Sequence, residues 1–452
     1  TDKAMQNALR QYTDLFDANR PTIDAAAGTP LNAPRDKARA TLEGASLPTH
    51  HTEGYEKTSI EEMFAPDYGV NVARVGIPVD VAASFRCDVP NLSTLLATVV
   101  NDKFIPAATL ESRLPEGVTF MSLARASREM PEIVSRYYAS VAPDSDPCVA
   151  LNTMLAQDGV FIHLARNVQP EKALQLVNIF QAPVPMAAFR RVLVVLEEGA
   201  ALRLLVCDHT QDRTNSYLAS QVTEIHLAPG ARLEMCAIEE SSPLTSRHSM
   251  TFVNQEADTE AVINSTTLTC GKSRNDFHVS LRGPHAVSRL SGMAIGGDSM
   301  HIDNNTSVVH NSGHCHSDQL FKYVLDNESQ GAFEGSIVVK PDAAFTEAYQ
   351  TNRNILASEK ASMHCKPQLI INNDDVKCSH GASTGQLDDE ALFYMQARGI
   401  PKEEARTMLM QAFMVDVIET VKIPGLREKL HHLVDRRFAG SLGECASCRN
   451  HE

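Results

Sequence analysis

Short apolar runs rich in Val, Ile, Leu and Thr dominate the middle of the chain. From VFIHL at 160 onward, Gly, Pro, Asn and Asp separate such runs, as in RVLVVLEE, LRLLVCD, AVINSTTL and FEGSIVVK. This texture predicts many short strands and therefore an all-β core. Because no helical pattern intervenes, strands at roughly constant spacing favour a β-helix, in which each coil buries its apolar face on the next. A sandwich or a barrel is the alternative.

One local theme occurs twice and supports the β-helix. EEGAALRLL at 197–205 and APGARLEMC at 228–236 each place a tight Gly-Ala turn before a strand, with an offset of 31 residues. The offset is a weak signal of a repeat, because only two copies are visible.

Helical patterns flank this core on both sides. Before it, ALRQYTDLF and RDKARATLE have helical periodicity, LPEGVTFMSLA is a strand candidate and EMPEIVSRYY a helix candidate. After Gly385, three segments have helical periodicity, and Pro401 and Pro424 precede two of them as helix-start signals. We therefore predict an N-terminal helical and mixed region at 1–147, a β core at 148–385, a C-terminal helical domain at 386–440 and a tail at 441–452.

The middle C-terminal helix carries an apolar stripe. Met408, Leu409, Ala412, Phe413 and Val417 recur at spacings of three and four residues. Packing on neighbouring elements is the favoured interpretation, and a groove for a partner is the alternative.

Composition narrows the class of protein. Among 452 residues, 43% are hydrophobic and 21% charged, and no apolar run is long enough to cross a bilayer. The net charge of −15 disfavours nucleic acid as a partner, since a phosphate backbone would repel it. Ten scattered cysteines and an N-terminal stretch without secretory features predict free thiols and a cytoplasmic location.

A Gly-Lys-Ser triplet in CGKSRND at 270–276 raises the question of a nucleotide site. A phosphate-binding loop requires a further glycine where this chain has Thr266, so the sequence predicts no ATPase machinery of its own.

Two groups of potential metal ligands have only weak support. VVHNSGHCHSDQ contributes His310, His314 and His316, but in an extended segment Cys315 points away from its two neighbours, and a hydrogen-bonded strand end is the favoured interpretation. Cys445 and Cys448 form a single C-x-x-C in a polar tail, whereas a closed zinc site needs four ligands.

The stretch DDVKCSHGAS at 374–383 is the strongest candidate for chemistry. Following the strand LIINN, the residues Val376, Cys378 and His380 alternate onto one face of the next strand. Cys378 and His380 are expected to be half-buried there, with His380 near the end of the strand beside Gly381. A thiolate beside an imidazole suits iron–sulfur or zinc chemistry better than magnesium or calcium. On spacing alone, a buried cysteine and a hydrogen-bonded histidine remain the simpler interpretation. Cys365, on the preceding strand, is either an added thiol near this site or a buried bystander.

The run from 318 to 400 resembles the SufB/SufD family of cytoplasmic iron–sulfur cluster assembly proteins. The residues that carry the resemblance are SDQLFKYVLD, GAFEGSIVV, YQTNRNIL and KPQLIINNDDVKCSHGASTGQLDDEALFYMQARGI. LPTHHTEGYEKTSI matches the family's N-terminal connector more loosely, with Gly54-Tyr55 where a Glu-Trp pair is usual.

The resemblance implies a mainly β protein with a right-handed parallel β-helix core between N-terminal and C-terminal helical domains. It also implies a non-enzymatic scaffold subunit of the SUF system that pairs with SufB, or with a second copy of itself, and docks the ATPase SufC. In the family, the histidine at the position of His380 is implicated in forming the nascent cluster at the SufB interface, and Cys378 is its neighbour on the same face.

The same resemblance assigns SufC docking to the C-terminal helices. Met410, Phe413, Met414 or Val417 would offer apolar contacts on whichever face the helices leave open. The expected cluster is transient and forms in the complex, so no metal is expected in the isolated chain, and the sequence gives no support for a flavin site.

Two other functions compete with the scaffold: a polysaccharide-cleaving enzyme and a stable zinc protein. A β-helix polysaccharide lyase or hydrolase would need paired carboxylates or a basic residue in an open groove, and usually an aromatic sugar platform, but this chain has no tryptophan. A zinc protein that uses His310, His314 and His316 would retain metal on isolation.

Overall fold

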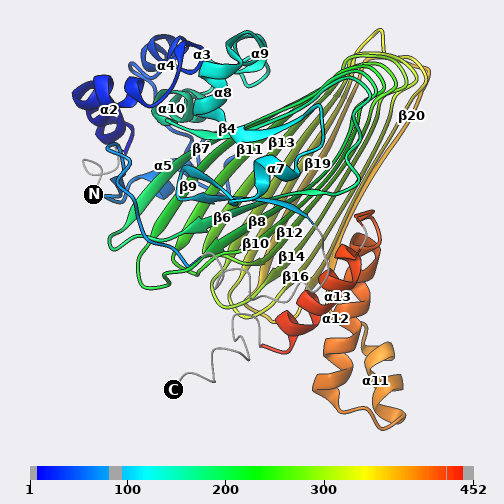
Figure 1. The fold of residues 1–452 in the computed structure, drawn as a ribbon. Helices are drawn as coiled ribbons and strands as arrows, with labels where there is room; N and C mark the ends of the chain where they lie inside the picture. Colours follow the sequence, from blue (N-terminus) through cyan, green and yellow to red (C-terminus); the bar gives the residue numbers. More distant parts are fainter. Residues whose placement is uncertain (1–7, 81–93, 424, 441–452) are drawn as a thin grey trace.

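A computed structural model describes residues 8–80, 94–423 and 425–440, and its core is a parallel β-helix made of two sheets (Figure 1). Within the described residues each sheet has ten strands. Sheet A contains β4 (Val118–Ser122), β5 (Gly159–Leu164), β7 (Met186–Leu196), β9 (Tyr217–Leu227), β11 (Thr245–Gln255), β13 (Lys272–Leu281), β15 (His301–His310), β17 (Gln330–Val339) and β19 (Ser362–Ile371), with β1 (Gly69–Val70) beside β7. Sheet B contains β3 (Lys103–Pro106), β2 (Leu95–Val100), β6 (Leu174–Phe180), β8 (Ala201–Thr210), β10 (Arg232–Glu240), β12 (Glu260–Thr269), β14 (Val287–Gly296), β16 (His316–Leu325), β18 (Thr346–Leu356) and β20 (Val376–Gly385).

From β5 onward, consecutive strands alternate between the sheets, and from β6 onward each pairs in parallel with the strand of the previous coil. Ala201 of β8 pairs with Arg232 of β10, 31 residues further on, so the predicted repeat is one coil of the β-helix. Gly199 and Gly230 have φ of +68° and +73°, a conformation that glycine adopts without strain and that makes the tight turn before each strand. The sandwich and the barrel are therefore wrong, and the β-helix is confirmed.

The interior between the sheets is filled by alternate residues of every strand. Leu202, Leu233 and Ala261 stack from coil to coil on sheet B and meet residues such as Ile225 and Val279 of sheet A in one continuous apolar cluster. This core gives the coils a fixed register, because a slip of one residue would turn each apolar side chain outward.

N-terminal helices cover the outer face of sheet A at β5, β7, β9 and β11 (Figure 1). They are α2 (Ala8–Ala25), α3 (Thr29–Asn32), α4 (Arg35–Thr41), α5 (Ile60–Phe64), α8 (Leu123–Glu129), α9 (Pro131–Tyr137) and α10 (Pro147–Leu155), while α7 (Leu110–Arg113) packs at β2. The strand and helix predicted around 118 and 131 are confirmed as β4 and α9. The β-helix already begins at β2, which pairs with β6, whereas α10 lies inside the range predicted as core.

C-terminal helices cover the outer face of sheet B. They are α11 (Asp389–Ala397), α12 (Lys402–Ile418) and α13 (Leu426–Phe438), and all three confirm the helical patterns of the sequence. Met414 and Val417 pack with Cys236 and Met293 of sheet B. Lys322 fixes the contact, since its Nζ lies 2.5 Å from Asp416 Oδ2 and donates to the Phe413 carbonyl at 2.9 Å.

Across the described residues, no helix has both the length and the apolar character that a bilayer crossing requires. The Gly-Lys-Ser triplet leads into β13, where Lys272 and Ser273 are strand residues, so no phosphate-binding loop forms there.

Candidate functional site at the terminal coil

The last coil of the β-helix is open. Within the part of the chain that the structure describes, β19 and β20 are the outermost strands of sheets A and B, and each pairs on one side only (Figure 1). Unpaired backbone N–H and C=O groups at such an edge are a template for a further strand. The candidate site residues Cys378 and His380 lie on β20.

Cys378 lies at the margin of a small apolar cluster. It pairs in register with Ala348 of β18 and packs with Val376 and Leu369 against Ile337. Burial raises the pKa of the Cys378 thiol, so at neutral pH the group is protonated in the isolated chain. The predicted alternation is confirmed, because the side chains at 376 and 378 share this inward face.

His380 is the exposed member of the pair. It continues the same face of β20 but is solvent-exposed, and it lies in the middle of the strand rather than near its end as the sequence suggested, because β20 continues to Gly385. The predicted half-buried position for His380 is therefore wrong. The residue is exposed because no later coil covers the face that an inner strand would bury.

Beneath His380 lies an ordered polar floor. Its partner in register is Gln350, which is buried and donates from Nε2 to Gln319 Oε1 at 3.2 Å. Thr306 donates to the same oxygen at 2.6 Å. Gly335 makes room for this contact, since a Cβ there would lie 2.1 Å from Gln350 Nε2. These hydrogen bonds link β15, β16 and β18 directly below the position of His380.

Cys365 of β19 lies at the other end of the same coil. Its thiol donates to Asn352 Oδ1 at 3.0 Å, receives a hydrogen bond from Asn354 Nδ2 at 3.2 Å and lies 3.7 Å from Thr384 Oγ1. Burial raises the pKa of this thiol, while its hydrogen bonds with Thr384 and Asn354 act in the opposite direction. Cys365 is thus a half-buried, hydrogen-bonded thiol.

These residues form an incomplete ligand set. Among the described residues, no three His, Cys, Asp or Glu side chains converge into a metal site. The described residues supply one thiol and one imidazole at this open edge, fewer than the four ligands of closed iron or zinc sites, so further ligands are needed to bind a metal there.

The histidines of VVHNSGHCHSDQ do not meet. His310 is buried and lies 2.8 Å from Ser317 Oγ, whereas His314 stacks between His285 and Phe345 in the turns. His316 lies near Glu347 on the outer face of sheet B. The zinc-site alternative is therefore wrong for these histidines. Cys445 and Cys448 lie outside the described residues.

The predicted partner-binding residues lie mostly inside the C-terminal layer. Met410, Met414 and Val417 are 9%, 0% and 0% exposed, and Phe413 is half-buried with the Lys322 ammonium 4.6 Å from its ring centre. Packing of this helix on its neighbours is confirmed, and its buried face consists of Ala405, Met410, Met414, Val417 and Ile418. Of the predicted stripe, Val417 is buried and Leu409 and Phe413 are partly buried against this face, whereas Met408 is exposed.

Exposed apolar side chains of the same layer lie on another surface. Phe393 and Tyr394 of α11 are 73% and 60% exposed, and Met408 of α12 is 44% exposed. Sequence periodicity did not identify Phe393 or Tyr394 as exposed residues that could contact a partner. The adjacent Phe and Tyr in this helix were the signal that could have identified them.

The two sheets, the open coil with its thiol and imidazole, and the helical layers define a β-helix protein with an uncapped end. A model of the SUF system FeS cluster assembly SufBD core domain matches residues 179–413, and a model of the SufBD protein N-terminal region matches residues 6–176. The chain therefore belongs to the SufBD family.

Two of the curated relatives align over nearly the full chain. The iron–sulfur cluster assembly protein SufD of Escherichia coli is 27% identical over 96% of this chain and 97% of that protein. A SufBD family protein of Synechocystis sp. is 25% identical over 92% and 90%, respectively. SufD of Bacillus subtilis is 25% identical over 71% of this chain and 74% of its own length.

Proposed function

We propose that this chain is a non-enzymatic scaffold subunit of SUF iron–sulfur cluster assembly in the cytoplasm. The observation that carries the proposal is the open terminal coil, where His380 is exposed and Cys378 half-buried on one face of an edge strand. An incomplete ligand set suits a cluster that is built and passed on, because the described residues alone cannot enclose it. Family membership supports the same process.

The partner that completes the ligand set is a second β-helix, and SufB is the proposed one. The edges of β19 and β20 supply unpaired backbone groups for strand addition, and Ile370 and Ile371 add apolar surface, being 48% and 42% exposed. Without SufB, the same edges would accept a second copy of this chain.

The proposed docking surface for the ATPase SufC is the exposed part of the C-terminal layer. Phe393, Tyr394 and Met408 are available there, whereas Met410, Met414 and Val417 support the surface from below by holding α12 on sheet B. Exposed aromatic side chains are frequent anchors of protein interfaces.

Anaerobic co-purification tests the proposal directly. The chain is expressed with SufB and SufC, and iron and acid-labile sulfide are measured in the purified complex. We expect a ternary complex that assembles a cluster, and little iron or sulfide when the chain is purified alone. A chain that elutes separately from both partners, or clusters that form equally well without it, would contradict the proposal.

A further inference from the structure

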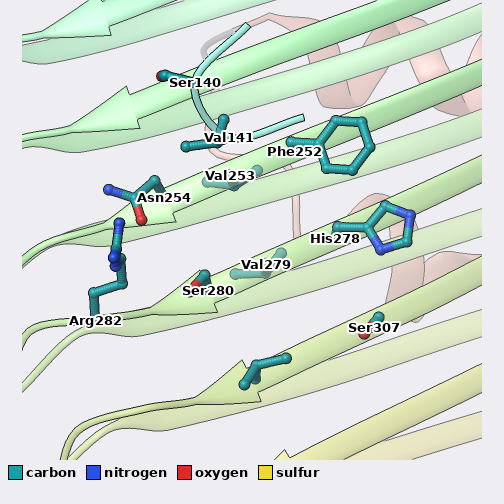
Figure 2. Close-up of a pocket in the computed structure, with 11 residues that line it drawn as sticks. Ser140, Val141, Phe252, Val253, Asn254, His278, Val279, Ser280, Arg282 and Ser307 are labelled. Carbon is teal, nitrogen blue, oxygen red and sulfur yellow. The ribbon is translucent and has the colours of Figure 1, made fainter. Parts of the chain in front are cut away.

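A pocket of about 300 Å³ opens on the outer face of sheet A, away from the terminal coil (Figure 2). Its floor is formed by β11, β13 and β15, and its rim by the connection from α9 to α10. The lining includes Val141, Phe252, Asn254, His278, Ser280 and Arg282. This volume is at the lower end of the range of about 300 to 1,000 Å³ in which small-molecule ligands are usually bound.

One side of the pocket is aromatic and uncharged. Phe252 and His278 stack with ring centroids 4.8 Å apart and an interplanar angle of 9°. Burial lowers the pKa of His278, so the imidazole is neutral at pH 7. Figure 2 shows both rings on the same side of the pocket, on adjacent strands. This side suits an apolar group.

The opposite side combines an unsatisfied acceptor with a cation. Asn254 is only 8% exposed, and its Oδ1 is buried without a hydrogen-bond partner in the described part of the chain. Its Nδ2 donates to Glu256 Oε1 at 3.1 Å. A buried carbonyl that lacks a donor is unfavourable, so a ligand that donates to it gains affinity.

Arg282 supplies the positive charge beside that acceptor. It is exposed, and among the described residues it takes part in no ion pair. In Figure 2 its side chain extends toward Asn254. The planar donors of its guanidinium match a carboxylate.

We propose that this pocket binds the zwitterion of an α-amino acid with an apolar side chain. The carboxylate would pair with Arg282, and the ammonium group would donate to Asn254 Oδ1 close to the Glu256 carboxylate. The side chain would lie against Phe252 and Val141. A dianion such as phosphate fits less well, because Glu256 lies next to the acceptor and only one cation faces the ligand. The site is independent of the proposed scaffold function.

Calorimetry on the full chain at pH 7 tests the ligand class. L-Phenylalanine and L-leucine should bind with a Kd in the millimolar range or below. 3-Phenylpropanoate lacks the ammonium group and phenethylamine lacks the carboxylate, so each should bind at least about tenfold more weakly than L-phenylalanine, a difference of about 1.4 kcal/mol. No binding of either amino acid, or tighter binding of inorganic phosphate, would overturn the proposal.

Two matched variants test the location. Arg282→Gln removes an exposed charge and should weaken L-phenylalanine binding at least about tenfold while leaving the melting temperature unchanged. Arg232→Gln makes the same change at an exposed arginine of sheet B and should leave the Kd unaltered. Equal affinity in the wild type and Arg282→Gln would show that the amino acid binds elsewhere, and would overturn the assignment.

Discussion

Cys378 and His380 are separated by one residue on β20, yet they differ in how a metal would engage them. Burial raises the pKa of the Cys378 thiol, so binding there must displace a proton. His380 is exposed and can turn its ring toward a partner without disturbing the core. We infer that the imidazole is the first contact with the cluster and that the thiol is recruited when the partner β-helix encloses the edge.

Replacing His380 by alanine should therefore affect assembly without affecting folding. His380→Ala removes little buried area, so the free energy of unfolding should change by less than about 0.5 kcal/mol. Cluster formation with SufB and SufC should fall severalfold, as measured by anaerobic iron and sulfide content. His364→Ala, at another histidine of the terminal coil, is the control and should assemble clusters normally. A His380→Ala chain that matches the wild type in both measurements would make His380 a bystander.

A second residue-scale prediction concerns the buried ion pair under the N-terminal connector. Burial alone would raise the pKa of Asp276, but the Arg274 guanidinium at 2.8 Å and the His248 ring nitrogen at 2.8 Å outweigh it and hold the pKa well below its usual range. Arg274 also lies 4.0 Å from the ring centre of Tyr55, and Asp303 accepts from Thr58 at 2.6 Å. The pair therefore links the connector to sheet A.

Asp276→Asn should lower the free energy of unfolding by about 3 to 5 kcal/mol at pH 7, because it leaves Arg274 partly unpaired in the interior. The ionised Asp276 has a lower pKa in the folded than in the unfolded chain. Its contribution is thus complete above the unfolded value of about 3.9 and is lost as the pH falls toward the folded value. In urea unfolding at pH 7 and below pH 4, the free energies of unfolding of the wild type and Asp276→Asn should become more similar as the pH falls. A constant difference across pH would contradict this.

At the scale of elements, the C-terminal layer is held on sheet B by apolar packing and two polar anchors. Asn264 donates from Nδ2 to the Val417 carbonyl at 3.2 Å and to Thr420 Oγ1 at 3.1 Å. Lys322 is buried and contacts Asp416 and the Phe413 carbonyl. These anchors fix the end of α12, so they set the position of the proposed docking surface.

Lys322→Met keeps the volume of the side chain and removes the anchor. Loss of the charge-assisted hydrogen bonds should cost about 1 to 3 kcal/mol and should be felt mainly in α12. Hydrogen exchange should therefore speed up in α12 and remain unchanged in β11 and β13. Lys377→Met, at a lysine whose side chain is 76% exposed, should change exchange nowhere in α12. Unaltered protection of α12 in Lys322→Met would show that packing alone holds the layer.

The exposed aromatic pair of α11 should decide ATPase binding. The double variant Phe393→Ser, Tyr394→Ser changes two side chains that are 73% and 60% exposed, so melting should be nearly unaffected. SufC affinity should drop at least about tenfold in a titration, because exposed aromatic anchors dominate such interfaces. Val75→Ser, at an apolar residue that is 64% exposed in the N-terminal part, is the control. Equal SufC binding by the wild type, the double variant and Val75→Ser would place the docking surface elsewhere.

The sequence predicted the strands and helices better than the exposure and packing of the residues on them. Alternation along β20 correctly assigned Cys378 to the inward face, since strand geometry is local. The exposure of His380 could not be predicted in this way, because it depends on whether another coil follows. In α12, periodicity identified a helix but chose Met408 instead of Met410 for the buried face, because the position of sheet B sets that face. The contact between Cys365 and Thr384 could not be predicted either, because it depends on how β19 and β20 lie next to each other in the folded coil.

At the scale of the whole molecule, N-terminal helices pack on sheet A and C-terminal helices on sheet B, and both sheets end at the same open coil. Helices bury part of the outer face of each sheet, while within the described residues β19 and β20 have no neighbour on one side (Figure 1). Removing residues 386–452 would expose Val177, Leu205 and Met293 on sheet B, so this truncation should aggregate rather than leave a stable β core. Point variants at the surface are therefore the sharper test of each partner.

The open end should be the surface that associates. Ile370 and Ile371 lie at the end of the edge strand β19 and are 48% and 42% exposed, so Ile370→Lys, Ile371→Lys places two charges where a partner strand would pair. Natural sheets use lysine at edges to prevent such pairing. We expect the variant to melt like the wild type, because the changed side chains are already hydrated in the isolated chain. In sedimentation experiments it should lose SufB binding, and also any self-association of the wild type.

Val184→Lys, at a residue that is 50% exposed between β6 and β7, introduces one charge far from this edge and should leave both associations intact. SufB binding that survives the double substitution would exclude this end of the β-helix as the interface and would separate His380 from the proposed site of cluster assembly.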